Sequence, residues 1–335
     1  MSRIAVMGSG AWGTAIALHL TRVGGHEVTL WSHSERVART IAECGENRDF
    51  LPGFRFPTSL KVTASQGEAL GSAEVVVSVM PSHHVRHSYE EFARYLRADQ
   101  KLVSATKGIE DVTFLPMSHV IAEVTGAHGL RLPLAVISGP SFAQEVAEGS
   151  PTAVTVASDD AGFAGEVQRV FSSASLRLYT NDDVCGVEMG GALKNVMAIA
   201  SGIVTGLGLG HNSTAAIITR GIAEMTRLAV ACGGKRETLA GLAGMGDLVL
   251  TCTGSLSRNR TVGVELGKGR KLDEILAGLG GKVAEGVRTT SAALGLAAKM
   301  GVEMPIAEQV QAVLEDRCSP LEGMQALMSR PGRDE

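Results

Sequence analysis

The sequence predicts two regions of different fold class, a doubly wound, mainly parallel α/β sheet in residues 1–181 and an all-helical region in residues 182–335. In the first region short β-branched runs alternate with helical patterns, as in parallel strands joined by crossover helices. From about Asp182 these runs give way to long patterns rich in Ala, Gly and Leu. A chain of 335 residues is long enough to build a separate core in each region.

The N-terminal segment has the pattern of a strand, a glycine turn and a helix. The apolar run Arg3–Met7 precedes Gly8-Ser9-Gly10-Ala11-Trp12-Gly13, and the helical segment Thr14–Leu20 follows it. Glycines at this spacing permit a tight turn, leave room for a pyrophosphate and let helix and strand pack closely. The helix N-terminus offers unpaired N–H groups to the phosphates. We therefore expect an NAD(P)-binding Rossmann fold.

The end of the second predicted strand, Glu27–Trp31, bears on which dinucleotide binds. In NAD-specific sites an Asp or Glu about 20 residues beyond the glycines binds the ribose hydroxyls. This chain has Ser32 and His33 there. With no carboxylate to repel it, a 2′-phosphate would fit near Ser32, His33 and Arg36. The pattern favours NADP(H) and leaves NAD(H) open.

The rest of the first region continues the alternation. The run Glu74–Val79 is almost entirely β-branched, as a strand buried on both faces requires. We predict further strands at Lys61–Ala64, Lys101–Thr106, Leu134–Ser138, Thr152–Ala157 and Leu176–Tyr179, helices at Glu35–Cys44, Tyr89–Leu96, Met117–Val124 and Ala161–Ser172, and an irregular loop at residues 47–57.

Ligands of such sheets bind beyond the carboxyl ends of the strands. Residues 8–13, 81–82, 107–108 and 139–141 all follow predicted strands directly. We expect these four loops to converge on one crevice.

In the second region the periodicity predicts helices throughout. Pro305 suits the first turn of one of them. The predicted helices are Val184–Thr205, Thr214–Cys232, Asn259–Gly267, Leu272–Leu279, Thr289–Met300, Pro305–Leu314 and Leu321–Met328.

Composition argues against several classes of function. The net charge is −4 and there is no basic stripe, so nucleic-acid binding is not expected. No apolar run reaches 18 residues, so no membrane span is predicted. Five scattered cysteines indicate reduced thiols in a cytoplasmic protein. His83, His84 and His87 lack an evident further ligand, and no metal site is predicted.

Three positions in the second region are unusual for simple core filling. Lys194 lies within an otherwise apolar helical segment, where a lysine either reaches solvent or faces a cavity with a lowered pKa. Asp247 lies among glycines and apolar residues, either as a helix N-cap or as a partner of Lys194 or of a substrate hydroxyl. Residues 257–260, Ser-Arg-Asn-Arg, open a predicted helix as either an anion site or a solvated cap.

Six motifs in sequence order resemble those of bacterial NAD(P)-dependent glycerol-3-phosphate dehydrogenases. The resemblance extends from residue 4 to about residue 315. The motifs are Gly-x-Gly-x-Trp-Gly at 8–13, Thr106-Lys107-Gly108, Ser138-Gly139-Pro140-Ser141-Phe142-Ala143, Ala192-Leu193-Lys194-Asn195-Val196, Gly241-Leu242-Ala243-Gly244-Met245-Gly246-Asp247-Leu248, and Cys252-Thr253 followed by Ser257-Arg258-Asn259-Arg260.

This resemblance implies a homodimer that interconverts dihydroxyacetone phosphate and sn-glycerol 3-phosphate with NADP(H) or NAD(H), supplying glycerophospholipid synthesis. It implies that Lys194 is the proton donor in reduction and the base in oxidation, with Lys107 and Asp247 beside the reacting carbons. The other substrate-binding residues it implies are Gly139, Ser141, Ser257, Arg258 and Asn259, and the cofactor-binding residues are Gly8, Ser9, Gly10, Ala11, Trp12, Gly13, His33, Lys107, Ala143, Arg258, Val283 and Glu285.

Two other readings share the architecture. One is a dehydrogenase of the β-hydroxyacid or 6-phosphogluconate type, and the other is a non-catalytic NADP-binding sensor. The element Ser257-Arg258-Asn259 and the strand end Lys107-Gly108 favour the glycerol phosphate reading. Loss of Lys107 or Lys194 would suit a sensor, and both lysines are present.

Overall fold

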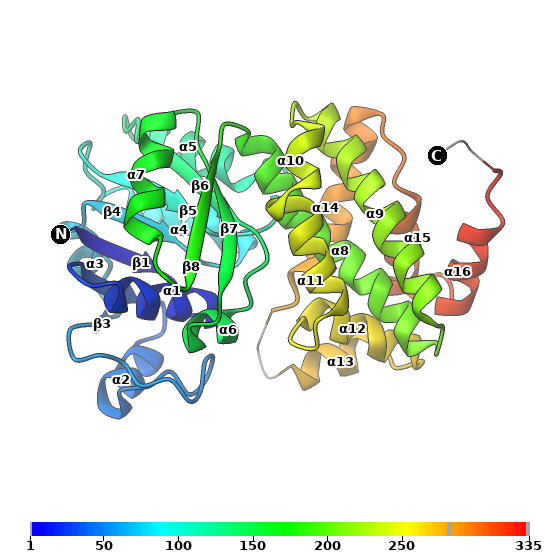
Figure 1. The fold of residues 1–335 in the computed structure, drawn as a ribbon, viewed down its shortest axis with the longest axis horizontal. Helices are drawn as coiled ribbons and strands as arrows, with labels where there is room; N and C mark the ends of the chain where they lie inside the picture. The colour runs from blue at the N-terminus through cyan, green and yellow to red at the C-terminus, as the bar shows by residue number, and fades with distance from the viewer. Residues whose placement is uncertain (1, 280–282, 333–335) are drawn as a thin grey trace.

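The computed structural model describes residues 2–279 and 283–332. It has two lobes side by side along the long axis, an α/β lobe that holds the strands and a helical lobe that begins with α8 (Val184–Gly206) (Figure 1). The last strand, β8, ends at Asn181 and α8 follows it, so the predicted fold classes, α/β first and all-helical second, are confirmed.

The strands of the described residues form one sheet in the order β3-β2-β1-β4-β5-β6-β7-β8. Neighbouring strands are parallel except β6 and β7, which are antiparallel, so the predicted mainly parallel, doubly wound sheet is confirmed. The strands are β1 (Arg3–Met7), β2 (Glu27–Trp31), β3 (Lys61–Thr63), β4 (Val75–Ser78), β5 (Lys101–Ser104), β6 (Leu134–Ser138), β7 (Thr152–Ala157) and β8 (Leu176–Asn181).

Both faces of this sheet are buried by helices. On one face, alternate strand residues such as Ile4 and Val6 pack against α1 (Ala11–Arg22), α6 (Ala143–Glu148) and α7 (Ala161–Phe171). On the other face of the sheet, Ala5 and Met7 pack against a second layer of helices. That layer consists of α3 (Gln66–Gly71), α4 (Val85–Phe92) and α5 (Met117–Ala127), while α2 (Glu35–Cys44) follows β2 and the 3₁₀ turn η1 (Ser82–His84) precedes α4.

The short helices α3 and α6 were not predicted, because six residues carry too little periodicity to reveal a helix. The predicted helix Tyr89–Leu96 also differs, since α4 starts at Val85, directly after η1. The polar residues at 86–88 hide this first turn in the sequence.

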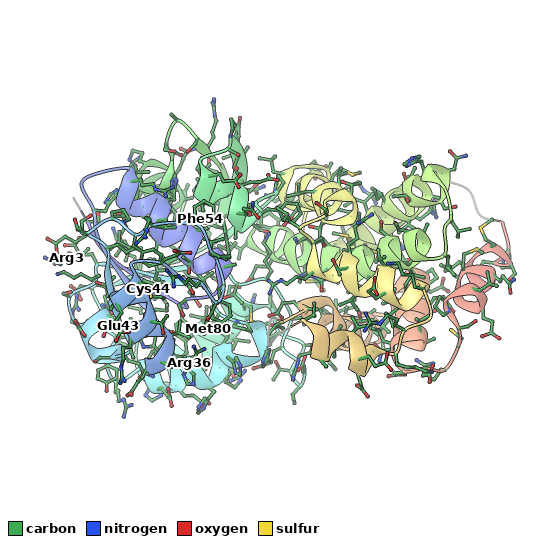
Figure 2. The ribbon with its side chains drawn as sticks, turned by 90° about the horizontal axis from the view of Figure 1, so that it is seen from below. Arg3, Arg36, Glu43, Cys44, Phe54 and Met80 are labelled. Carbon is green, nitrogen blue, oxygen red and sulfur yellow. The ribbon has the colours of Figure 1, made fainter. Side chains whose placement is uncertain are left out.

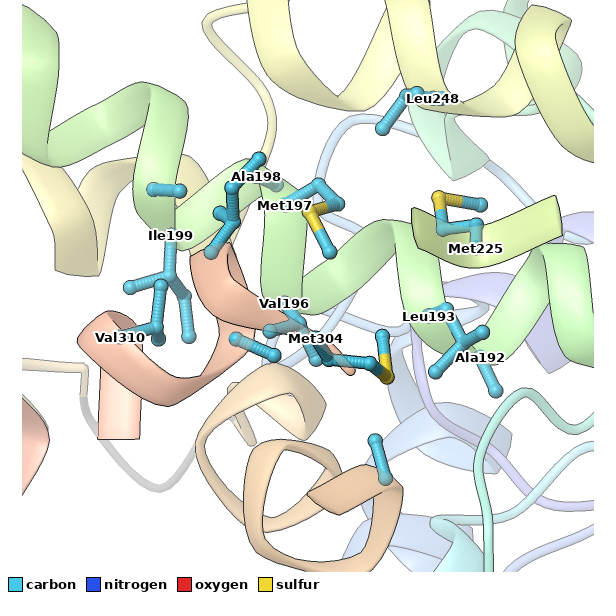
Figure 3. Close-up of a cluster of buried hydrophobic side chains, with 14 of the residues drawn as sticks. Ala192, Leu193, Val196, Met197, Ala198, Ile199, Met225, Leu248, Met304 and Val310 are labelled. Atoms are coloured by element: carbon cyan, nitrogen blue, oxygen red, sulfur yellow. The ribbon is translucent and has the colours of Figure 1, made fainter. Parts of the chain in front are cut away.

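The helical lobe is built around α8. Nearly all of α8 is buried, because other helices surround it, and it accordingly lacks a polar face. Figure 3 shows this core, in which Val196 and Met197 of α8 lie among side chains from other segments, including Met225 of a neighbouring helix and Met304, the N-cap of another. The other helices are α9 (His211–Ala231), α10 (Arg236–Ala240), the π turn η2 (Leu242–Gly246), α11 (Asp247–Thr253), α12 (Arg258–Gly267), α13 (Leu272–Gly278), α14 (Glu285–Met300), α15 (Pro305–Leu314) and α16 (Pro320–Met328).

By length and composition alone, α8 is apolar enough to cross a membrane. Its apolar window is wholly buried within the protein, as in the core helix of a globular lobe.

Glycines let α12 lie directly against α8. A Cβ atom on Gly202 of α8 would lie 2.2 Å from the carbonyl oxygen of Arg260, and one on Gly263 of α12 would lie 2.1 Å from that of Ile199. No larger residue fits at either position without moving a backbone. This close contact fixes the N-terminus of α12 beside the middle of α8.

The carboxyl ends of the strands face the helical lobe. Arg3, at the start of β1, lies at the outer end of the α/β lobe, whereas Met80, just after β4, lies closer to the helical lobe (Figure 2). The loops predicted to converge therefore meet at the junction of the two lobes.

Candidate active site

Three charged side chains meet at the junction of the lobes. The Asp247 carboxylate is 1% exposed and contacts two ammonium groups, with its Oδ2 2.5 Å from Lys107 Nζ and its Oδ1 2.8 Å from Lys194 Nζ. Lys107 belongs to the α/β lobe, whereas the other two residues belong to the helical lobe. The two lobes thus assemble one cluster, and of the alternatives for Asp247 the partner of Lys194 is the correct one. Asp247 is the first residue of α11 and is not its N-cap, a position that Gly246 occupies.

Further hydrogen bonds hold the two lysines in place. Lys107 follows β5 and donates from Nζ to the carbonyl oxygen of Gly139, after β6, at 3.1 Å. Lys194 projects from α8 and donates to Thr251 Oγ1 at 2.7 Å. The Thr251 hydroxyl donates in turn to the carbonyl oxygen of Asp247 at 2.6 Å. Thr251 lies one turn after Asp247 on α11, and the sequence analysis missed it because it predicted no helix there.

Burial and charge set the protonation of this cluster. Burial lowers the pKa of Lys194 to about 8, and the positive charge of Lys107 acts in the same direction while Asp247 opposes it. Burial alone would raise the pKa of the Asp247 carboxyl, but the two ammonium groups outweigh it and keep that pKa below its usual value. At neutral pH the cluster therefore holds one carboxylate between two cations, one of which releases its proton near pH 8.

The N-terminus of α12 lies beside this cluster. Ser257 is its N-cap and accepts from the backbone N–H of Arg260 at 3.2 Å. Asn259 donates to Asn195 Oδ1 at 2.9 Å, and its own Oδ1 accepts from the N–H of Gly286 at 2.9 Å. The first N–H groups of a helix have no partner within it, and Arg258, the first residue, is exposed. This end therefore presents N–H groups and a guanidinium.

Glu285, the first residue of α14, links the helical lobe to the loops after β4 and β5. Its Oε2 accepts from the Ser82 hydroxyl at 2.8 Å. Burial raises the pKa of the Glu285 carboxyl, and the hydrogen bonds from Ser82 and the charge of Arg258 partly counteract this effect. Gly108 lies against the same serine, with no room for a Cβ atom. Residues 81–82, 107–108 and 139–141 thus converge at the junction, as predicted.

The glycine turn has the shape expected of a phosphate cradle. Gly8 has φ of +134°, and a Cβ atom there would lie 2.2 Å from the carbonyl oxygen of Val79. A Cβ on Gly13 would lie 1.9 Å from the carbonyl oxygen of Gly8. A Cβ atom on Gly10, by contrast, would meet no described atom within 4 Å other than its chain neighbours, and no side chain caps α1. The N–H groups at the start of α1 are therefore left without a side-chain partner.

Polar contacts fix this turn to the rest of the lobe. The Ser9 hydroxyl donates to Ser32 Oγ at 2.8 Å, and the carbonyl oxygen of Ser9 accepts from Asn47 Nδ2 at 2.8 Å. Ser9 is therefore open to a ligand chiefly through its backbone. Asn47 lies in the predicted irregular loop, and the sequence analysis gave no signal for this contact.

The predicted 2′-phosphate site is only partly present. Ser32 is 1% exposed, and its hydroxyl accepts from Ser9 and donates to the carbonyl oxygen of Ser34, so this hydroxyl is bonded within the protein and the preference for NADP(H) stays a prediction. Arg36 is exposed but forms an ion pair with Asp49 at 2.7 Å. His33 is exposed at the end of β2.

The other expected site residues are partly buried. Ala11, Trp12 and Ala143 are partly buried and pack on the same apolar core at the starts of α1 and α6. The Ser141 hydroxyl donates to the carbonyl oxygen of Gly139 at 3.0 Å. Val283 is half-buried just before α14.

No metal centre is found in the described part of the chain, where no three His, Cys, Asp or Glu side chains gather as ligands. Burial, together with the charge of His84 and Arg288, lowers the pKa of His83 to about 4.

Comparison with known proteins places the chain in a single family. A family description of the NAD-dependent glycerol-3-phosphate dehydrogenase N-terminus matches residues 3–164, and one of the C-terminus of the same enzymes matches residues 183–325. The glycerol-3-phosphate dehydrogenase (NAD(P)+) of Acidobacterium capsulatum is 76% identical over the whole of both chains. That of Koribacter versatilis is 58% identical, covering 100% of this chain and 99% of its own.

A solved structure of a glycerol-3-phosphate dehydrogenase has nearly the same fold as this chain. The crystal structure of glycerol-3-phosphate dehydrogenase from Coxiella burnetii superposes with a TM-score of 0.94 at 40% identity, covering 98% of this chain and 99% of the other. A PanE/ApbA family ketopantoate reductase from Ralstonia eutropha reaches a TM-score of only 0.61 at 16% identity, covering 96% of this chain and 99% of its own, and shows the fold alone.

Proposed function

Because the chain belongs to the NAD-dependent glycerol-3-phosphate dehydrogenase family and is an oxidoreductase with NAD(P)H as cofactor, we propose that it interconverts dihydroxyacetone phosphate and sn-glycerol 3-phosphate. The reaction takes place at the cluster of Lys107, Lys194 and Asp247. The observation that carries the proposal is the contact of Lys107 and Lys194 with Asp247 across the two lobes. Membership of the family supports the reaction, and the geometry of Lys107, Lys194 and Asp247 supports the role proposed for each of them.

Lys194 is the acid and base of this proposal. Negative charge develops on the carbonyl oxygen during reduction, and a buried ammonium both stabilises it and delivers the proton. With its pKa lowered to about 8, Lys194 is still protonated at neutral pH but gives up its proton readily. Asp247 holds Lys194 from one side while Thr251 accepts its second hydrogen bond. Lys107 adds a second positive charge beside the reacting carbons.

The cofactor fits the open face of the glycine turn. The nicotinamide ring supplies the hydride when bound. Residues 8–13 would hold the pyrophosphate, because the space in front of Gly10 is open and the N-terminus of α1 lacks a side-chain cap. His33, Ala143, Val283, Glu285 and Arg258 border the same side and would line the rest of the cofactor.

The N-terminus of α12 would hold the substrate phosphate. Arg258 supplies an exposed guanidinium, and the unpaired N–H groups of the first turn supply further donors. Ser257 and Asn259 support this site mainly by fixing the helix end, since their side chains bond Arg260, Asn195 and Gly286. Binding energy from the phosphate then orients the carbonyl at the lysines.

The proposal also covers the domain boundaries, the compartment and the assembly of the enzyme. We place the cofactor-binding domain at residues 1–181 and the substrate domain at residues 182–335, which the end of β8 and the start of α8 support. The five cysteines are unpaired, as in a cytoplasmic protein. A homodimer that supplies glycerophospholipid synthesis is the assembly and role that the family resemblance supports.

Oxidation of NADPH at 340 nm with dihydroxyacetone phosphate tests this function. Parallel reactions contain NADH in place of NADPH, or unphosphorylated dihydroxyacetone as substrate. We expect rapid turnover with the phosphorylated substrate alone, because the α12 site needs the phosphate. Equal turnover without the phosphate would contradict the anion site, and binding of NADPH without turnover would contradict the reaction.

A further inference from the structure

One loop of the α/β lobe belongs to the core of the helical lobe. Residues 107–116 follow β5 and begin with Lys107. Ile109 is 1% exposed and packs in the same apolar cluster as Val196 and Ala293, whereas the sheet residues pack in other clusters. Phe114 packs against the same helical-lobe cluster. The segment that carries one catalytic lysine is therefore anchored in the lobe that carries the other.

Phe114 makes the most specific of these contacts. Its backbone has φ of +60°, which is uncommon for a non-glycine residue and turns the ring toward α14. There the ring occupies a notch at Gly295, where a Cβ atom would lie 2.4 Å from the ring carbon Cζ. Only glycine at 295 leaves this space.

Hydrogen bonds make the loop one unit between Lys107 and the ring. Ile109 pairs with Pro116 as an isolated β-bridge, and the N–H of Glu110 donates to the carbonyl oxygen of Leu115 at 2.9 Å. The N–H of Phe114 donates to the carbonyl oxygen of Glu110 at 3.1 Å. These bonds connect the backbone of Phe114 to Ile109, two residues after Lys107.

The far end of the loop is fixed to the same lobe. The N–H of Ser118, in the first turn of α5, donates to the Glu188 carboxylate of α8 at 2.8 Å. On the solvent side, Asp111 and Arg288 of α14 pair at 3.4 Å. Val112, by contrast, is 85% exposed and contacts neither lobe's core.

We propose that Phe114 is a positioning residue that acts through Lys107, because its ring in the Gly295 notch holds the loop so that the Lys107 ammonium reaches Asp247. The proposal rests on the catalytic role of Lys107 stated above. Phe114 itself is not placed at the substrate or cofactor. Its removal loosens the loop at α14, where the pair of Asp111 and Arg288 remains, and lets Lys107 retreat from the cluster. Lys194, Asp247 and Thr251 keep their contacts within the helical lobe.

The first test compares Phe114→Ala, Phe114→Leu and the matched loop variant Val112→Ala in the reduction of dihydroxyacetone phosphate. We expect Phe114→Ala to lower kcat by about 10- to 100-fold, the range for a misplaced catalytic group, with the KM for NADPH little changed. Phe114→Leu should restore most of the rate, and Val112→Ala should behave as wild type. Normal kcat in Phe114→Ala would overturn the proposal.

The second test repeats Phe114→Ala in a Lys107→Ala background. If Phe114 acts through Lys107, the second substitution lowers kcat no further. Independent, multiplying losses would overturn the positioning role. An unimpaired Lys107→Ala enzyme would instead contradict the proposed role of Lys107, so the two failures are distinguishable.

The pH profile gives a readout that a purely structural role would not move. Lys194 is faced by Asp247, Lys107 and the thiol of Cys252, and the charge of Lys107 contributes to its lowered pKa. Retreat of Lys107 should therefore shift the high-pH limb of reduction upward in Phe114→Ala. Where Phe114→Ala fails to fold, Gly295→Ala, which closes the notch from the other side, should show the same shift, and an unshifted limb in a folded variant would overturn the proposal.

Discussion

Asp247 and Glu224 are both buried carboxylates of the helical lobe, but their surroundings are opposite. Asp247 contacts two ammonium groups, which hold its pKa below the usual value although burial acts the other way. Glu224 of α9 accepts from the backbone N–H of Ile306, in the first turn of α15, at 2.8 Å. Burial raises the pKa of Glu224 to about 7.

The difference separates a reaction centre from a structural cap. A carboxylate between two cations can hold them at a shared point in space and tune their protonation. A carboxylate at a helix N-terminus satisfies donors that would otherwise be unpaired, and these N–H groups favour its charged form while burial favours its neutral form.

Removing the Lys194 ammonium should have the largest effect. Lys194→Met keeps the length and apolar stem of the side chain but cannot donate a proton. We expect kcat for reduction to fall by about 10²- to 10⁴-fold, the usual contribution of general acid catalysis, while NADPH still binds. Steady-state kinetics and NADPH titration by fluorescence measure the two quantities. Turnover within a few-fold of wild type would exclude Lys194 as the acid.

Arg258 should affect binding more than turnover. Arg258→Ala removes the exposed guanidinium at the α12 N-terminus, and we expect the KM for dihydroxyacetone phosphate to rise about 10- to 100-fold, as for loss of a charged hydrogen bond. The same substitution should leave the slow reaction of unphosphorylated dihydroxyacetone nearly unchanged. An equal loss with both substrates would place Arg258 elsewhere than at the phosphate.

The lowered pKa of Lys194 predicts opposite pH profiles for the two directions. Reduction needs the ammonium and should decline above about pH 8, whereas oxidation needs the free amine and should rise up to about pH 8. Profiles of kcat/KM report the free enzyme and allow this comparison. If the pH profiles of reduction and oxidation changed in the same direction, they would contradict Lys194 as the acid of one reaction and the base of the other.

The smallest effect concerns stability at Glu224. A raised pKa means that the folded state holds the proton more tightly than the unfolded state, so this group's contribution is full below about pH 4.5 and is lost as pH rises through about 7. Relative to Glu224→Gln, wild type should lose at most about 3 kcal/mol of unfolding free energy between pH 5 and 8. Urea unfolding at both pH values measures the difference, with the exposed Glu43→Gln as control. A constant difference would mean that Glu224 does not titrate as described.

Much of the fold was predictable because long segments with a regular hydrophobic pattern can be assigned from the sequence alone. The buried strands and α8 were identified almost to the residue, since continuous apolar runs leave few alternatives. Lys194 was conspicuous for a related reason, as a charge inside an apolar helix. The small helices α3, α6, α10 and α11 were missed, because their sequences are short or lie among glycines.

Contacts between distant segments were not predictable from one sequence. Thr251 belongs to the cluster only because α11 places it one turn beyond Asp247. Ser32 was expected at a ligand, but the fold turns its hydroxyl inward to Ser9. The Phe114 ring meets Gly295 across the two lobes, and neither residue carries a local signal of this contact.

The most direct test of the contrast is kcat for dihydroxyacetone phosphate reduction by Asp247→Asn and Glu224→Gln, measured side by side. Each variant changes one buried carboxylate into an amide of nearly the same shape. We predict that Asp247→Asn loses at least about 100-fold in kcat, because the two lysines repel each other without the carboxylate, and that Glu224→Gln stays near wild type. Similar kcat values for the two variants would contradict the assignment of Asp247 to the reaction centre.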